Sequence, residues 1–166
     1  MDVGRSRVLL ALAFGLALVH GAGDDLTDEE RWPLIFAAGE GDGAAVERLL
    51  ASGADPGQRS KDGETPLHVA AIRGDMRTMR ALLAAGAEVD ARTPKGATIY
   101  MTPTMWAVYH GHQEFVRALL DAGADPNAAD ENGKTLLAMS KEARQSEIED
   151  LLREAITKAA TTKQEL

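Results

Sequence analysis

The sequence predicts an all-α solenoid of about four helix-turn-helix units joined by short turns or hairpin tips. Three observations indicate this fold. Similar segments recur every 33 to 37 residues. The apolar content comes mainly from Ala and Leu, whereas aromatic residues make up only 4% of the chain. Glycine and proline return at fixed places in each copy. A period of this length is typical of stacked repeats, and Ala-Leu cores favour closely packed helices over sheets.

The period is clearest in three segments of similar sequence. These are GDGAAVERLLASGADP at 41–56, GDMRTMRALLAAGAEV at 74–89 and GHQEFVRALLDAGADP at 111–126. Equivalent positions are 33 residues apart in the first two copies and 37 apart in the next two. Upstream, GETPLHVAA at 63–71 is echoed at 31–38, 101–108 and 133–140. The third copy therefore contains four additional residues, in GATIYMTP before its first helix.

Each copy has the boundaries of two short helices. Thr65 can cap the first helix, and Pro66 suits the first helical position, where a missing N–H has no cost. Gly74 and Asp75 separate the two helices, and Asp75 can cap the second one. Gly86 stands where a helix commonly ends with a left-handed residue. One unit cannot bury both of its faces, so neighbouring units must stack.

The segment DGETPLHVAAIRGD, followed by LLAAGAEVDA, resembles an ankyrin repeat. The resemblance covers about residues 27–153 and implies a repeat domain at 24–160, with units at about 27–58, 59–91, 92–128 and 129–157. The outer units depart from the pattern, as capping units do. Ser146 and Glu149 have capping-box spacing at the start of the last helix, which we expect to continue to about Thr161. The resemblance also implies a non-catalytic module that binds another protein through its concave face.

Residues 1–23 have the three parts of a secretory signal peptide. Arg5 and Arg7 precede an apolar run from Val8 to Val19, and the small residues of HGAG follow. Cleavage after Gly21 or Gly23 is expected. An uncleaved anchor or a buried helix is the alternative, although the run is shorter than the roughly 20 apolar residues that a bilayer requires. We expect no membrane contact after cleavage.

The last residues, 161–166, are predicted to form a flexible tail that ends in KQEL. This sequence resembles the retention signal of proteins in the lumen of the endoplasmic reticulum (ER). Its residues are Lys163, Gln164, Glu165 and Leu166. Two settings remain open: the ER lumen, with KQEL as an address, or a bacterial periplasm, with KQEL accidental. In the second setting the protein would protect or inhibit an exported enzyme.

The four additional residues and the end of the following helix predict a partner-binding patch on the concave face, across units two and three. Inserted loops often carry function, and exposed apolar clusters tend to be contact sites. Alternatively, the inserted side chains fold back over the neighbouring unit. Trp106 is predicted to be a core residue. The predicted patch contains Ile72, Arg73, Ile99, Tyr100, Met101, Tyr109 and His110, and its charged rim contains Arg59, Lys61, Asp62, Glu64, Arg92 and Lys95.

Composition argues against other functions. The chain has no cysteine, and its formal net charge of −8 does not favour nucleic-acid binding. His110 and His112 could be proposed as metal ligands, but no carboxylate or third histidine stands at ligand spacing. His68 and His112 are instead predicted to join turns by hydrogen bonds. We therefore expect a monomer with no cofactor, no metal and no enzyme activity.

Overall fold

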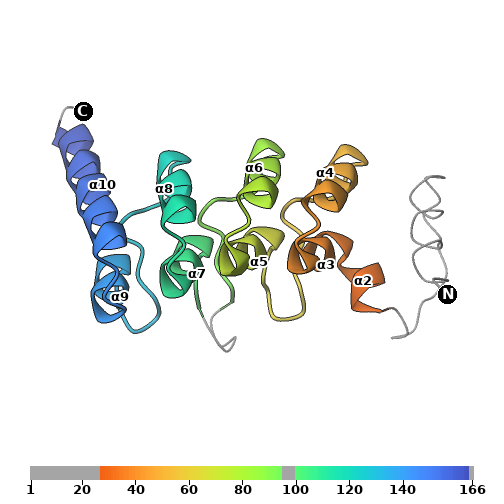
Figure 1. Cartoon of the computed structure of the whole chain (residues 1–166), viewed down its shortest axis with the longest axis horizontal. Helices are drawn as coiled ribbons and strands as arrows, with labels where there is room; N and C mark the ends of the chain where they lie inside the picture. The colour runs from red at the N-terminus through yellow and green to blue at the C-terminus, as the bar shows by residue number, and fades with distance from the viewer. Residues whose placement is uncertain (1–26, 95–99, 165–166) are drawn as a thin grey trace.

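The structure is a computed structural model that describes residues 27–94 and 100–164. Within these ranges the chain forms helices and no strand, which confirms the all-α solenoid of four units. Figure 1 shows two rows of helices: a lower row of α3, α5, α7 and α9, which we call the inner helices, and an upper row of α4, α6, α8 and α10, which we call the outer helices. The helices are α2 (Asp28–Arg31), α3 (Pro33–Glu40), α4 (Gly43–Ala51), α5 (Pro66–Arg73), α6 (Met76–Ala84), α7 (Pro103–His110), α8 (Gln113–Asp121), α9 (Leu136–Glu142) and α10 (Ser146–Gln164).

Inner helices start as their sequences predict. Thr65 and Thr102 have extended backbones as the N-cap residues of α5 and α7, and each is followed by proline at the first helical position. Thr135 caps α9 by accepting a hydrogen bond from the amide of Ala138. In unit one Trp32 occupies this place and makes no capping bond. There the short helix α2, capped by Thr27, packs against α3 and covers the end of the stack.

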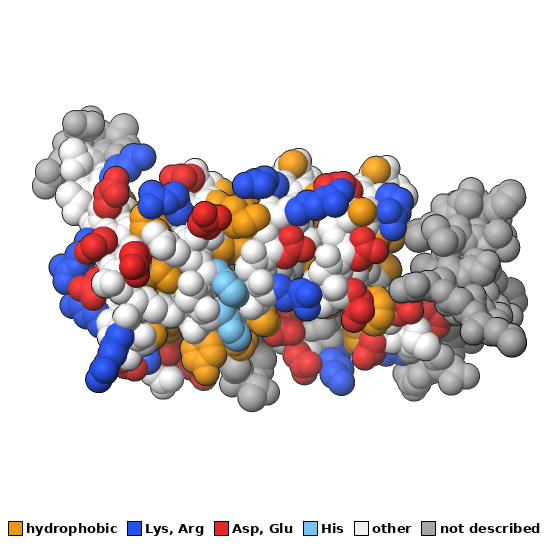
Figure 2. Space-filling view, viewed as in Figure 1, with side chains coloured by type: hydrophobic (Ala, Val, Ile, Leu, Met, Phe, Trp, Pro, Cys, Tyr) orange, Lys and Arg blue, Asp and Glu red, His pale blue; other side chains and the backbone are white. Residues whose placement is uncertain are grey.

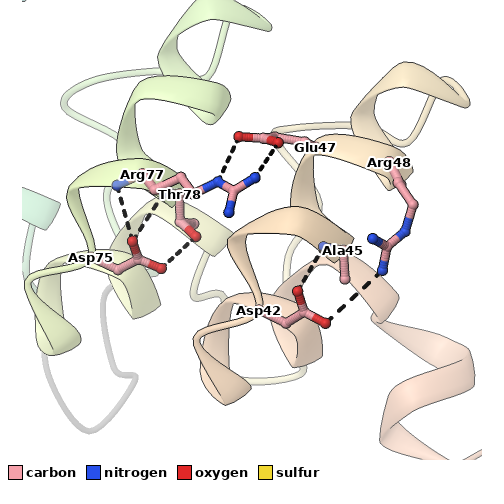
Figure 3. Close-up of polar contacts among 7 residues, drawn as sticks. All are labelled: Asp42, Ala45, Glu47, Arg48, Asp75, Arg77 and Thr78. Atoms are coloured by element: carbon pink, nitrogen blue, oxygen red, sulfur yellow. Dashed lines mark hydrogen bonds and ion pairs between the residues drawn. The ribbon is translucent and has the colours of Figure 1, made fainter.

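Outer helices α4 and α6 start at aspartates (Figure 3). Asp42 Oδ1 accepts from the amide of Ala45 at 2.9 Å. Asp75 makes more bonds, because Oδ1 accepts from the amides of Arg77 and Thr78 and Oδ2 accepts from the Thr78 hydroxyl at 2.6 Å. These oxygens satisfy amides that have no partner inside the helix.

One core runs through all four units. It is built from Leu34, Val46, Leu67, Leu82, Val108, Phe115, Leu119, Leu136 and Leu152, which are all at most 1% exposed. Small residues lie where the inner helices meet: Ala38, Ala70, Ala71 and Ala107 are fully buried. Because alanine has only a methyl group, neighbouring helices can approach closely, so the side chains of α3, α5 and α7 interdigitate across the units.

The tips of units two, three and four are closed by equivalent backbone hydrogen bonds. The amide of Ser60 donates to Glu64 O, and the amide of Asp130 donates to Lys134 O, whereas the amide of Thr93 donates to Met101 O across four more residues. The insertion therefore lies at the tip of unit three, as predicted. Its central residues 95–99, which include Lys95 and Ile99, lie outside the described residues.

Helix α10 continues further than the sequence suggested. A flexible tail was predicted from residue 161, but the helix ends at Gln164, so this boundary was wrong. The hydroxyls of Thr157 and Thr161 each donate to a carbonyl one turn earlier, which satisfies these side chains within the helix. Residues 1–26 and 165–166, and with them the predicted signal peptide and the last two residues of KQEL, lie outside the described residues. No helix in the described ranges is long and apolar enough to span a bilayer.

Candidate partner-binding surface

An apolar side chain occupies the fourth position of every inner helix. These residues are Phe36, Val69, Trp106 and Met139. Phe36 is 40% exposed, and the others are partly buried and pack against the core with part of their surface. Three residues further along, on the same helix face, Ile72 is partly buried and Tyr109 is exposed. We call these six residues the inner-helix stripe: Phe36, Val69, Ile72, Trp106, Tyr109 and Met139.

Tyr109 is the most prominent member of the stripe. It is 69% exposed, which is unusual for a large aromatic side chain. Its ring stands perpendicular to Trp106, with the centroids 6.0 Å apart and the planes at 87°. It is also nearly perpendicular to His110, at 5.2 Å and 80°. Trp106 and His110 stack at 5.8 Å with planes 22° apart, so Tyr109 stands roughly perpendicular to a stacked pair of rings. We call Trp106, Tyr109 and His110 the aromatic corner. Aromatic residues of this kind are enriched among binding hot spots.

His112 continues the stack of rings but has a structural contact of its own. Its ring lies 5.9 Å from that of His110, and the planes are 15° apart. His112 Nε2 lies 3.0 Å from Ile72 O, which can only accept, so Nε2 donates. The ring also faces Gly74, where an added Cβ would lie 2.8 Å from Nδ1. His112 therefore joins units two and three, as predicted. Histidine side chains are visible at the middle of the stack in Figure 2, next to hydrophobic side chains.

Three other residues of the predicted patch, Arg73, Tyr100 and Met101, do not belong to the inner-helix stripe. Arg73 is exposed at the end of α5, with its guanidinium beside Gly41 of unit one. Tyr100 is partly buried at the tip, where the Arg92 guanidinium lies 5.0 Å from its ring centroid. Met101 is only 7% exposed and belongs to the core, so its assignment to the exposed patch was wrong. The physical reason is its double hydrogen bonding to Thr93, which holds this end of the turn against the stack.

Trp106 also differs from its predicted core position. It is partly buried, and one part of it contacts the core while the ring stacks on His110. Trp106 Nε1 is buried without a hydrogen-bond acceptor. Leaving such a donor unpaired costs about 1–3 kcal/mol, so the position is not optimised for the core alone. Trp106 occupies the same position of the repeat as Phe36, Val69 and Met139, since successive members of this set are 33, 37 and 33 residues apart. This shared position in the sequence indicates that the four side chains belong to one row.

His68 has the structural role that its position predicts. It is fully buried, and Nδ1 accepts from the amide of Thr65 at 3.1 Å, so the proton of the neutral ring is on Nε2, which donates to Met101 O at 3.0 Å. Burial lowers the pKa of His68 from 6.5 to about 4, and the charge of Arg59 adds to the effect, whereas the bond to Met101 opposes it. The ring is therefore neutral at physiological pH and cannot serve as an exposed ligand.

The predicted charged rim connects the tips. Arg59 Nη1 donates to Gly63 O and to Arg92 O of the next unit, at 3.0 and 2.9 Å. Arg92 Nη1 repeats this contact with Ala129 O at 2.9 Å. Among the rim acids, Glu64 is partly buried, and this burial together with the charge of Asp62 raises its pKa. No group of His, Asp and Glu side chains in residues 27–94 and 100–164 is arranged to hold a metal ion.

One further hollow was not anticipated from the sequence. A groove of about 460 Å³ lies between the end of α8, with the turn that follows it, and the middle of α10. Its lining includes Leu120, Pro126 and Ala155.

The repeat geometry agrees with comparison to known families. The family described as Ankyrin repeats (3 copies) matches residues 34–130 and 95–162, which together exceed half of the chain. The chain belongs to the ankyrin-repeat family. Ankyrin-repeat proteins are typically non-catalytic modules that bind other proteins. No curated protein matches the chain. In this ankyrin-repeat chain the candidate contact surface is the inner-helix stripe, which includes Trp106 and Tyr109 of the aromatic corner.

Proposed function

We propose that this ankyrin-repeat protein is a non-catalytic adapter that is exported into the secretory pathway, is retained in the ER lumen and captures another protein through the inner-helix stripe. The observation that carries the binding surface is the aromatic corner. Tyr109 is 69% exposed beside the stacked rings of Trp106 and His110. A rigid aromatic surface loses little conformational entropy on binding, which favours its use as an anchor.

The stack supports this role by holding the corner in a fixed position. Trp106 packs against the core, and His112 is fixed by its bond to Ile72 O. Tyr109 and His110 belong to the last turn of α7, whose C-cap amide donates to Ala107 O and Val108 O. The contact groups are therefore arranged before a partner arrives, and a partner meets a surface that does not have to reorganise.

Export and retention rest on the sequence. The apolar run from Val8 to Val19 with its basic start favours entry into the secretory pathway. KQEL resembles a retention signal. The ER lumen is thus our proposed location, and a periplasmic protein that protects or inhibits an exported enzyme is the alternative.

Cross-linking in cells tests the capture of a partner. The full chain, Tyr109→Ala and the control Arg80→Ala would be expressed in a eukaryotic cell and cross-linked. Arg80 is exposed on the outer helix α6, so its loss should leave binding unchanged. We expect a cross-linked partner with the wild type and Arg80→Ala, and at least a fivefold loss with Tyr109→Ala, since a hot-spot side chain contributes more than about 1 kcal/mol. Equal cross-linking of all three forms would contradict the proposed surface.

Localisation tests the second half of the proposal. The full chain and a variant without residues 163–166 would be followed in the same cells. Retention of the first and secretion of the second would support the ER address. Equal secretion of both would reject the address and favour the periplasmic alternative.

A further inference from the structure

The spacing of the inner-helix stripe restricts the shape of its partner. The stripe offers one fourth-position side chain per inner helix: Phe36, Val69, Trp106 and Met139. Neighbouring inner helices lie side by side (Figure 1), and packed helices are about 8–10 Å apart. The stripe is therefore a row of apolar contacts that repeats about every 8–10 Å along the stack.

Among regular backbones, the polyproline II helix fits this interval best. It rises about 3.1 Å per residue with three residues per turn, so every third side chain lies on one face, about 9.3 Å from the next. Same-face side chains of a β-strand are about 6.8 Å apart. Those of an α-helix repeat about every 5.4 Å, and a helix would need about 20 residues to span the four contacts. An extended segment of about ten residues covers the same distance.

The aromatic corner is suited to such a segment. Trp106 and Tyr109 are perpendicular at 6.0 Å, so that a ligand side chain can contact one ring with its edge and the other with its face. Polyproline II segments dock in grooves lined by aromatic residues, since their conformation is already formed and costs little entropy to fix. Phe36 offers a second exposed ring two units away.

Charges along the inner row give the segment a direction. Residues 27–42 and 61–75, which form the inner part of units one and two, contain eight acidic and three basic side chains, hence a net charge of −5. Residues 100–112 and 130–145, the part of units three and four that the structure describes beyond the gap at 95–99, contain three of each, hence zero without the histidines. In the described chain, Glu40, Asp62 and Glu64 make no ion pair. A basic end therefore fits over units one and two.

We infer that the inner-helix stripe binds an extended, polyproline II segment of another protein, which carries an apolar side chain at every third residue and Lys or Arg at the end that lies over units one and two. This inference rests on the proposed function, because it specifies the partner of the same surface. An amphipathic helix and an acidic segment are the competing occupants.

Panning of random peptides of about twelve residues, displayed on phage, on the purified full chain tests the inference. We expect the enriched peptides to repeat Pro, Leu or aromatic residues every third position and to carry Lys or Arg at one end. We also expect Phe36→Ala and Tyr109→Ala to weaken a selected synthetic peptide at least fivefold in fluorescence anisotropy. Both side chains are exposed, so the variants should fold. Glu114→Ala, exposed on the outer helix α8, is the matched control and should bind like wild type.

The charge prediction has its own variant. Glu40→Gln with Asp62→Asn removes two acids that make no ion pair, and should weaken the same peptide about threefold or more at low salt but little at high salt, where exposed charges are screened. Enriched peptides with a helical period, with acidic ends, or with unchanged affinity for Tyr109→Ala would overturn the inference. A selection that enriches nothing would also overturn it. If the cellular cross-link still depends on Tyr109, the proposed function stands without this segment; if it does not, both fail.

Discussion

Protonation of His68 should destabilise the fold as the pH falls. In the folded state the pKa is about 4, because burial disfavours the charged ring and the charge of Arg59 adds to this effect. In the unfolded chain it returns to about 6.5. Between these values the unfolded state binds a proton that the folded state does not, so stability rises with pH across this window. The full interval corresponds to about 3 kcal/mol, which is present above pH 6.5 and lost by about pH 4.

Urea denaturation followed by circular dichroism at a series of pH values measures this loss. His68→Met is a suitable control because unit three carries Met105 at the equivalent position, where its sulfur accepts from the amide of Thr102 at 3.4 Å. The substitution removes the titrating group, whereas the carboxylates that also titrate remain. Wild type should lose about 3 kcal/mol more than His68→Met between about pH 7 and about pH 4. Parallel pH profiles of the two proteins would refute the assigned role of the ring.

Two matched pairs of substitutions test other contacts by the same denaturation assay. Gly86→Ala should cost about 1 kcal/mol because φ is 87° and the space around its Cβ is open, whereas Gly74→Ala should cost about 2–3 kcal/mol because φ is 70° and the new Cβ would displace His112 from its hydrogen bond. A difference below about 0.5 kcal/mol would contradict the contact with His112. Asp75→Ala should cost about 1–2 kcal/mol and more than Asp42→Ala, since Asp75 accepts three hydrogen bonds at the start of α6 and Asp42 accepts one at the start of α4. The opposite order would show that the number of capping bonds does not decide the loss.

The fold could be predicted because repetition amplifies weak local signals. One Thr-Pro pair or one glycine indicates little, but their return at a fixed period identifies units that can only be stable when stacked. The four additional residues in unit three were placed correctly by the same comparison. The site was harder to predict, since exposure depends on which side of a turn faces the stack. Met101 is buried because Thr93 makes two hydrogen bonds with its backbone. The residue types in the sequence do not predict this pair of hydrogen bonds.

The fourth position of the inner helices is less buried than the alignment of the repeats suggested. Trp106 was predicted to be a core residue because it aligns with an aliphatic position of the repeat that was taken as core, yet its counterpart Val69 is only partly buried and Phe36 is exposed. Equivalent positions in a solenoid have equivalent environments, because each unit sits on its neighbour in the same way. Trp106 therefore shares the partial burial of Val69 and Met139, and the sequence alone did not show how far this position is buried.

Unit three combines several departures from its neighbours, and these are physically connected. His68 of unit two reaches forward to Met101 O, but Met105 has no donor with which to repeat that bond toward unit four. At the tip, the contact of Arg92 with Ala129 O joins these two units. Unit three thus lacks one polar link between units, while the same helix exposes Tyr109 and His110 beside the partly buried Trp106. A unit selected only for stability would keep the histidine and bury fewer unpaired donors. The loss is understandable if the helix is shaped by contact with a partner, whose binding would then stabilise the junction between units three and four.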